Sequence, residues 1–341
     1  MKITIFRMRV FALILLGACQ ALAVGVPHFN LEDIVSGADS IVVADVSQIR
    51  DLGPARPIQF RTQFLQAEAY SADLAVRRTL KGPSLDEISV TYSLPVTFLG
   101  YRGLSRGIRM VFLRREKTKY QLAEPYYSNF PATLEGPEES ARSESPSDLV
   151  LGNMLAVLAS PMTSSTEKYE VLRVDYALPH NEKTIAALRN GLGAFNDREL
   201  NEKLQGELIR FGDLSELPVA AGLVSNDSAT QHGRDWLLYV IGNEVRDPRA
   251  IPRLKPLLSS SDDSVREAAV EALWHIAVPA AIPELVPKLG DPDEKVRFYA
   301  VRGLSDVANE YGWGGPSELE FHEHAQKYLA HWQEWAKNRS P

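Results

Sequence analysis

Part of the carboxy-terminal half of the chain repeats itself at a step of 31 residues, from Ile251 to Ile282. Residues of the same or a similar type occupy matching positions in 251–276 and 282–307, among them Pro252 and Pro283, Asp262 and Asp293, Arg266 and Arg297, and Leu273 and Leu304. A period of this length is typical of stacked helical hairpins, because a single hairpin cannot bury its apolar face alone. The sequence therefore predicts a helical solenoid, which offers a binding surface but carries no chemistry of its own.

The phase of this repeat continues upstream. Spacings of 32, 34 and 31 residues separate Ile185, Leu217, Ile251 and Ile282. This predicts four hairpins, and residues 149–158 with 169–176 are candidates for a fifth, irregular one. The last segment, residues 318–337, is predicted to form a helix that caps the open end of the solenoid. Its aromatic side chains and one alanine recur on one helical face: Phe321, Ala325, Tyr328, Trp332 and Trp335.

The recurring positions of each repeat are expected to have structural roles, either as buried helix residues or as helix caps. Offsets of 0, 4, 8 and 11 residues predict one buried helical stripe, made of Val265, Ala269, Leu273 and Ile276 in the first repeat. Ser260 and Asp291 are expected as N-caps of the helices that carry the stripes, with Asp263 and Glu294 three positions later.

The strings Asp262–Ala269 and Asp291–Arg297 resemble HEAT repeats, particularly the short phycobilisome-lyase-type variant. The resemblance covers residues 247–307 and implies a protein-binding solenoid over residues 149–341. A lyase activity by analogy is the weaker implication, because the repeat occurs widely without it and the mature chain would have no cysteine.

The first 23 residues have the pattern of an export signal, with a basic start and a short apolar run, residues 10–18. Two endings remain open. Residues 21–23 form a small-x-small cleavage site, whereas residues 16–19 resemble a bacterial lipobox, in which Cys19 would carry a lipid anchor. Either ending predicts an exported protein in the bacterial periplasm or cell envelope, and membrane attachment only through Cys19. Cys19 is the only cysteine, so no internal disulfide is expected.

Length, composition and net charge indicate how many domains the chain can form and which partners it can bind. A chain of 341 residues with 45% hydrophobic residues is long enough for two domains with proper cores. Its formal net charge of −7, without a long basic run, argues against nucleic acid as a partner.

The amino-terminal part, residues 28–131, has the periodicity of strands. Five short β-rich runs are predicted to form a small antiparallel barrel after a helix at residues 31–36: residues 40–46, 72–79, 87–92, 108–113 and 119–123. Residues 38–43, 76–82 and 107–115 resemble the small OB-like or netrin-like β-barrel of many secreted bacterial proteins, which implies no particular activity. Residues 132–148 are rich in Glu, Ser and Pro and are expected to be a flexible linker.

Candidate functional residues each have a structural alternative. Arg266 and Arg297 suggest an anion-binding ladder or, alternatively, ion pairs with acids of the neighbouring hairpin. Trp274 lies beside the apolar stripe and is the best single candidate for an exposed partner contact.

Catalytic and metal sites are less well supported. Ser105 lies in a G-x-S-x-G string, but a strand-like run follows it where a hydrolase would have a helix. The histidines at 322, 324 and 331 lack a carboxylate or cysteine at ligand spacing, so no metal and no cofactor are expected.

Taken together, the sequence predicts a two-domain α+β protein, a β-barrel followed by an all-α HEAT-like solenoid. The expected function is a non-enzymatic, exported scaffold that binds a protein partner through Trp274, Arg266 and Arg297. Two alternatives stay open: an envelope hydrolase that uses Ser105, and a cell-wall or carbohydrate binder that stacks sugar rings on Tyr101, Tyr126 and Tyr127.

Overall fold

The computed structural model describes residues 31–60, 63–96, 103–123, 128–134, 145–172, 178–193, 196–313 and 317–339. The chain divides into two compact units, residues 1–154 with 174–177 and residues 155–173 with 178–341. This division falls inside helix α3 (Pro146–Ala159), whose start overlaps the end of the expected linker. Most of that linker, residues 135–144, lies outside the described residues, and its flexibility stays a prediction.

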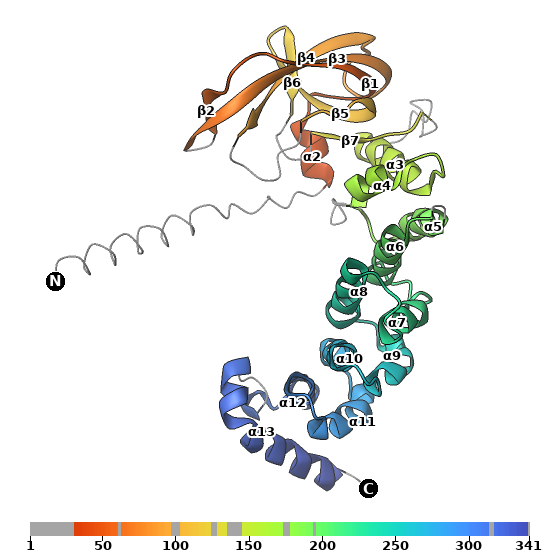
Figure 1. Ribbon diagram of the computed structural model, residues 1–341, viewed down its shortest axis with the longest axis vertical. Helices are drawn as coiled ribbons and strands as arrows, with labels where there is room; N and C mark the ends of the chain where they lie inside the picture. The colour runs from red at the N-terminus through yellow and green to blue at the C-terminus, as the bar shows by residue number, and fades with distance from the viewer. Residues whose placement is uncertain are drawn as a thin grey trace, which may run out of the picture. The chain divides into compact units, whose positions relative to one another are not determined.

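The first unit contains helix α2 (Leu31–Gly37) and a seven-stranded sheet. Its strands in chain order are β1 (Ser40–Asp51), β2 (Arg56–Phe60), β3 (Gln63–Lys81), β4 (Glu87–Pro95), β5 (Gly107–Glu116), β6 (Lys119–Leu122) and β7 (Asn129–Pro131). The strands pair in the order β1–β3–β4–β6–β5, and β5 pairs both with β7 and back with β1 (Figure 1). Only the pairing of β4 with β6 is parallel among these described strands.

Strand β1 pairs with both β3 and β5, and its first five residues are all buried. Val42, Ala44 and Val46 belong to one apolar cluster, together with Leu74 of β3 and Val111 of β5. The intervening residues of β1, 41 and 43, are also fully buried, and alternate residues of a strand point to opposite faces. This explains why the start of β1 is a continuous apolar run without alternation.

Each of the five expected strand segments overlaps an observed strand. Two further strands, β2 and β7, were not predicted from the sequence. Strand β2 pairs only with the amino-terminal part of β3, which makes β3 much longer than the expected segment 72–79.

The second unit is helical. Its helices after α3 are α4 (Ser165–Leu172), α5 (Glu182–Gly191), α6 (Arg198–Arg210), α7 (Leu217–Ser225), α8 (Gln231–Glu244), α9 (Ile251–Leu258), α10 (Asp263–Ile276), α11 (Ile282–Leu285), α12 (Glu294–Ala308) and α13 (Glu318–Arg339). A 3₁₀ turn, η4 (Val286–Gly290), continues α11. Among the described residues, none of these helices combines the length and the apolar character that crossing a bilayer requires.

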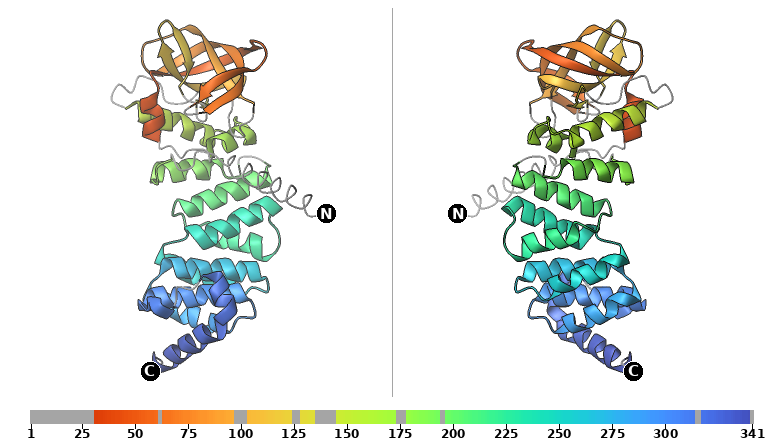
Figure 2. Two further views of the ribbon diagram at one scale, coloured as in Figure 1. Left: turned by 90° about the vertical axis from the view of Figure 1, so that its left-hand side faces the viewer. Right: turned by 90° about the vertical axis from the view of Figure 1, so that its right-hand side faces the viewer.

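These helices form hairpins stacked in two layers, as Figures 1 and 2 show. We call α7, α9 and α11 with η4 the A layer, and α6, α8, α10 and α12 the B layer. Along the B layer, α6 contacts α8, α8 contacts α10 and α10 contacts α12. The expected hairpins beginning at Ile185, Leu217, Ile251 and Ile282 correspond to α5/α6, α7/α8, α9/α10 and α11/α12.

One apolar cluster runs through the stacked hairpins. The predicted stripe of α10 is buried, with Val265, Ala269 and Leu273 fully inaccessible to solvent. The matching stripe of α12 is buried up to Leu304. Val307 is half-buried, since α12 ends one residue later.

The N-caps differ from the expectation. Asp262 caps α10 by accepting a hydrogen bond from the backbone N–H of Val265, and Asp293 caps α12 in the same way. Ser260 instead accepts a hydrogen bond from the N–H of Asp262, and Asp291 is an ion-pair partner of Arg266. The expectation was wrong by two residues because both loops contain several cap-competent side chains close together.

Helix α13 packs on α12, as expected for a cap. Phe321 and Trp332 are fully buried, and the indole N–H of Trp332 donates to the carbonyl of Trp313 at 2.9 Å. His324 has non-helical backbone angles, so α13 is kinked there.

Candidate functional site

The B layer presents polar and aromatic side chains on three consecutive helices. We define the B-layer cluster as Tyr239 and Asn243 of α8, Glu271 and Trp274 of α10, and Tyr299, Arg302 and Asp306 of α12. Spacings of three or four residues place the members from one helix on one face of that helix. The cluster therefore depends on the stacking of hairpins and crosses two steps of the repeat.

Trp274 lies at the centre of this cluster and is half-buried. Its indole N–H donates to the carboxylate of Asp306, with Nε1 and Oδ2 2.6 Å apart. Its ring stacks on Tyr299 with centroids 5.8 Å apart, and the guanidinium of Arg302 lies 4.4 Å from the ring centroid. Helix α12 thus fixes the orientation of Trp274, and the side chain keeps a partly exposed surface.

Glu271 is the acid of the cluster. Its carboxylate accepts a hydrogen bond from the amide of Asn243, with Nδ2 and Oε2 3.2 Å apart, and another from the hydroxyl of Tyr299. Burial raises the pKa of Glu271 above its ordinary value, against the opposing effect of nearby His275. Burial also raises the pKa of the Tyr299 hydroxyl to about 12. Glu271 therefore connects α8, α10 and α12 in one polar network.

A second carboxylate, Glu267, lies one turn before Glu271 on α10. It is half-buried, and burial raises its pKa, whereas Lys295 lowers it. Within the described part of the chain, Glu267 takes part in no hydrogen bond or ion pair, so its charge is available to a binding partner.

Aromatic rings continue the B layer toward α6. The ammonium of Lys203 lies 3.2 Å from the ring centroid of Trp236, whose indole N–H donates to the Lys203 carbonyl. Trp236 stacks on Tyr239 with centroids 5.9 Å apart. Tyr239 is 48% exposed and is thus the most accessible ring in this row. Exposed tyrosines that are ordered by neighbouring rings are common in protein interfaces.

The predicted partner contact Arg266 lies inside the repeat. Its guanidinium forms an ion pair with Asp291 of the next hairpin, with Nη2 and Oδ1 3.0 Å apart, and donates to the carbonyls of Ser260 and Ser261. Its side chain is 11% exposed. These contacts are those of the alternative raised from the sequence, in which the arginine pairs with an acid of the neighbouring hairpin.

Arg297 makes the equivalent loop contacts one repeat later. Its Nη1 donates to the carbonyls of Asp291 and Pro292, both at 2.8 Å. Arg234, which occupies the same position of α8, forms an ion pair with Asp262 at the start of α10. Arg234 and Arg266 therefore link successive hairpins, whereas the contacts of Arg297 lie within its own hairpin. The structure brings neither Arg266 nor Arg297 into the B-layer cluster.

The alternative hydrolase site has the wrong local geometry. Ser105 is exposed in a loop, and strand β5 begins two residues later at Gly107. A nucleophile of this type needs a helix after the serine, whose N-terminus stabilises the oxyanion. Gly107 has φ of +100°, which agrees with a glycine loop that leads into a strand.

The histidines of α13 are held by single acids. His322 Nδ1 lies 2.7 Å from Glu294 Oε1, and His331 Nε2 lies 3.2 Å from Glu310 Oε2. Among the described residues, no group of three His, Cys, Asp or Glu side chains has the geometry of a metal site. Cys19, the export signal and Tyr101, Tyr126 and Tyr127 lie outside the described residues.

Trp274 was predicted as a contact residue from the sequence, but its neighbours in the B-layer cluster were not. Glu271, Tyr299 and Arg302 do not recur in type at the 31-residue step, so repeat comparison gives them no weight. Two spacings in the sequence could have indicated these neighbours. Glu271 and Trp274 are three residues apart and so share one helical face, and 28 to 32 residues separate the contacting side chains of adjacent B-layer helices.

Comparison with known proteins agrees with this architecture. The family model described as HEAT repeats matches residues 218–305 and again residues 251–319. No curated protein matches the chain. Residues 218–319, which carry α7 to α12 and the B-layer cluster, thus consist of HEAT repeats, a class that commonly mediates protein–protein interaction.

Proposed function

We propose that this protein is an exported, non-enzymatic scaffold that binds a protein partner with the B-layer cluster of its HEAT repeats. The observation that carries the proposal is the row of partly exposed aromatic rings and half-buried carboxylates on α8, α10 and α12. Protein interfaces concentrate such rings at their centres, where they contribute most of the binding energy.

Pre-organisation supports this assignment. Tyr299, Arg302 and Asp306 hold Trp274 in one orientation, and Trp236 orders Tyr239. Side chains that are ordered before binding lose little conformational entropy when a partner docks. Half-buried Glu267 adds a carboxylate that a partner donor can satisfy.

Position-specific photocrosslinking in intact cells tests the docking surface. We expect p-benzoylphenylalanine at Tyr239 to give one discrete adduct, whereas the same label at Tyr311 gives none. Tyr311 is a matched control because it is an exposed tyrosine, 67% accessible, on the 3₁₀ turn η5 (Tyr311–Trp313) outside the B layer. The adduct at Tyr239 should disappear when Glu267→Lys is added. Equal adducts at both positions, or none at Tyr239, would contradict the proposal.

The export part of the proposal rests on the sequence of residues 1–23. Mass spectrometry of the mature amino terminus tests it and separates the two endings. A terminus at Val24 corresponds to cleavage after Ala23, and a lipid-modified terminus at Cys19 corresponds to the lipobox. A mature protein that retains Met1 to Ala23 would overturn export by this signal.

For the first unit we propose an OB-like barrel. The closed order of pairings β1–β3–β4–β6–β5–β1 supports it, because a closed path of pairings leaves none of these five strands at a sheet edge. Such barrels serve many functions, so the proposed binding function rests on the solenoid alone.

A further inference from the structure

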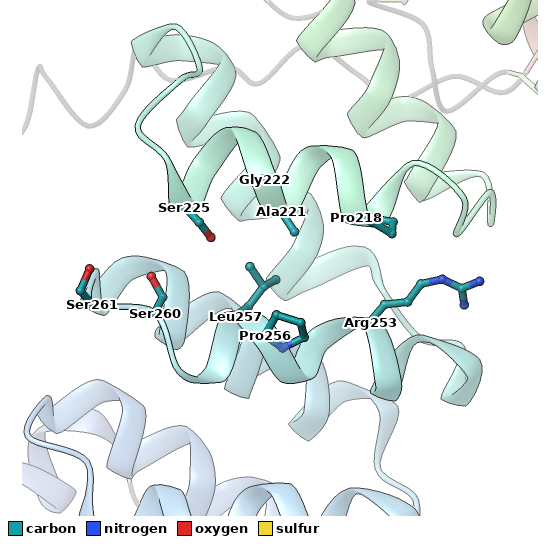
Figure 3. A pocket seen from close by; sticks show the side chains of 9 residues that line it. All are labelled: Pro218, Ala221, Gly222, Ser225, Arg253, Pro256, Leu257, Ser260 and Ser261. Atoms are coloured by element: carbon teal, nitrogen blue, oxygen red, sulfur yellow. The ribbon is translucent and has the colours of Figure 1, made fainter.

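The A layer carries a groove that the proposed function does not use. It lies between α7 and α9 and has a volume of about 560 Å³ (Figure 3). Its lining is made of Pro218, Ala221, Gly222, Ser225, Arg253, Pro256, Leu257, Ser260 and Ser261. Figure 3 shows Arg253 at one end of the groove and the three serines at the other, with apolar side chains between them.

Small residues on α7 open this groove. When the A-layer helices are aligned on Leu217, Ile251 and Ile282, Ala221 and Gly222 of α7 take the places of Lys255 and Pro256 in α9. In the next repeat the same places hold Val286 and Pro287. A Cβ added at Gly222 would meet no atom within 4 Å, so the space above this residue is empty.

The ion pair that joins α9 to α11 has no counterpart between α7 and α9 among the described residues. Between α9 and α11, Lys255 pairs with Glu284, with Nζ and Oε1 2.6 Å apart. The equivalent positions between α7 and α9 are Ala221 and Arg253, which cannot form such a pair. The guanidinium of Arg253 donates to the carbonyl of Arg249 at 3.2 Å, and within the described residues it forms no ion pair. The neighbouring Arg249 is already paired with Asp247 at 2.5 Å.

We propose that the α7–α9 groove binds a short amphipathic helix of a partner protein, whose acidic side chain pairs with Arg253 as Glu284 pairs with Lys255. The partner side chain is expected to be acidic because Arg253 is the one cationic residue among those that line this groove. The bound segment is expected to be helical because of the shape of the groove. The space between two neighbouring helices accepts the side-chain ridge of a third. This surface lies in the A layer and is independent of the B-layer cluster.

The dimensions limit the length of the ligand. Helix α7 has nine residues, which corresponds to about 13 Å at 1.5 Å per residue. About two turns of a docked helix fit along it, so the contact consists of apolar residues at spacings of three or four and one acid near Arg253. The hydroxyls of Ser225, Ser260 and Ser261 can bond polar groups at the other end.

Disulfide tethering tests this proposal without knowledge of the natural partner. The full chain carries Ser261→Cys at the serine end, and Cys19→Ser leaves this thiol as the only one. The probes are helical peptides of about 12 residues, each with one terminal cysteine and an apolar stripe. They differ at one position, which carries Glu, Gln or Lys. Capture at equilibrium in a thiol buffer is measured by intact-protein mass spectrometry.

We expect the Glu peptide to be captured about ten-fold better than the Lys peptide. Arg253→Glu should reverse this order, and the matched control Arg249→Glu should leave it unchanged. Gly222→Leu should abolish capture by filling the groove. This variant should fold like the parent protein, because the added side chain enters empty space.

Equal capture of the three peptides, or an unchanged order in Arg253→Glu, would overturn the proposal. Disulfide-linked dimers of the protein that outcompete every peptide would also overturn it and would indicate a second copy of the chain as occupant. Neither result bears on the crosslinking at Tyr239, because that experiment reports on the other layer.

Discussion

Arg266 and Asp291 form a buried ion pair that joins two successive hairpins of the solenoid. Their side chains are 11% and 4% exposed, and three hydrogen bonds run from the guanidinium to the two carboxylate oxygens. Burial raises the pKa of Asp291, but hydrogen bonds, with that of Arg266 first, more than offset this and hold it below its ordinary value. The pair therefore stays ionised in the fold and acts as a link between repeats.

Removing one member of this pair should destabilise the solenoid strongly. We expect Arg266→Leu to lower the free energy of unfolding by about 3 to 5 kcal/mol, because Asp291 would be left charged and buried. The double variant Arg266→Leu/Asp291→Leu should lose less than the single one. Urea unfolding followed by circular dichroism measures both, and a single variant as stable as the parent protein would contradict this role.

Buried Lys168 should make stability depend on alkaline pH. Its side chain is inaccessible to solvent, its ammonium donates to the Leu158 carbonyl at 2.7 Å, and burial lowers its pKa from 10.5 to about 8. Between these two values the unfolded chain binds more protons than the folded one, so stability should rise with pH. Below about pH 8 this rise should be absent.

Comparison with Lys168→Met isolates the effect. The difference in unfolding free energy between parent and variant should change in favour of the parent from about pH 8 to pH 10.5. Denaturant titrations at several pH values measure it. A difference that stays constant over this window would show that Lys168 keeps an ordinary pKa.

The stripe of α10 should carry a large share of the solenoid's stability. Leu273 is fully buried in the apolar cluster, and Leu273→Ala should cost about 2 to 5 kcal/mol. Leu319→Ala is the matched control, because Leu319 is 69% exposed and should cost less than about 0.5 kcal/mol. Equal thermal midpoints for the two variants would refute the stripe assignment.

The hydrogen bond from Trp274 to Asp306 should couple α10 to α12. A double-mutant cycle with Trp274→Phe and Asp306→Ala should give a coupling energy of about 1 kcal/mol, since the pair is half-buried and the acceptor is charged. Unfolding free energies of the four proteins measure this coupling. Additive effects of the two substitutions would exclude a contribution of this bond to stability.

The repeat half was predictable because its signal is periodic. The recurring apolar positions, such as Leu254, Val265 and Leu273, are buried in the apolar cluster of the stacked hairpins, so burial constrains their residue types and the helix positions follow directly. The five main strands were also predictable from their β-rich runs. Strands β2 and β7 were not, because short strands depend on a pairing partner more than on their own residues.

The sequence by itself determined the helical hairpins, the buried stripes and the position of Trp274 beside them, because these follow from local spacing and apolar character. Only the tertiary structure decided what surrounds Trp274, which charges are neutralised and where a groove stays open. These properties depend on residues 25 to 32 positions apart, such as Arg266 with Asp291 and Ala221 with Arg253. The distance between such residues is set by how hairpins stack, and no local pattern records it.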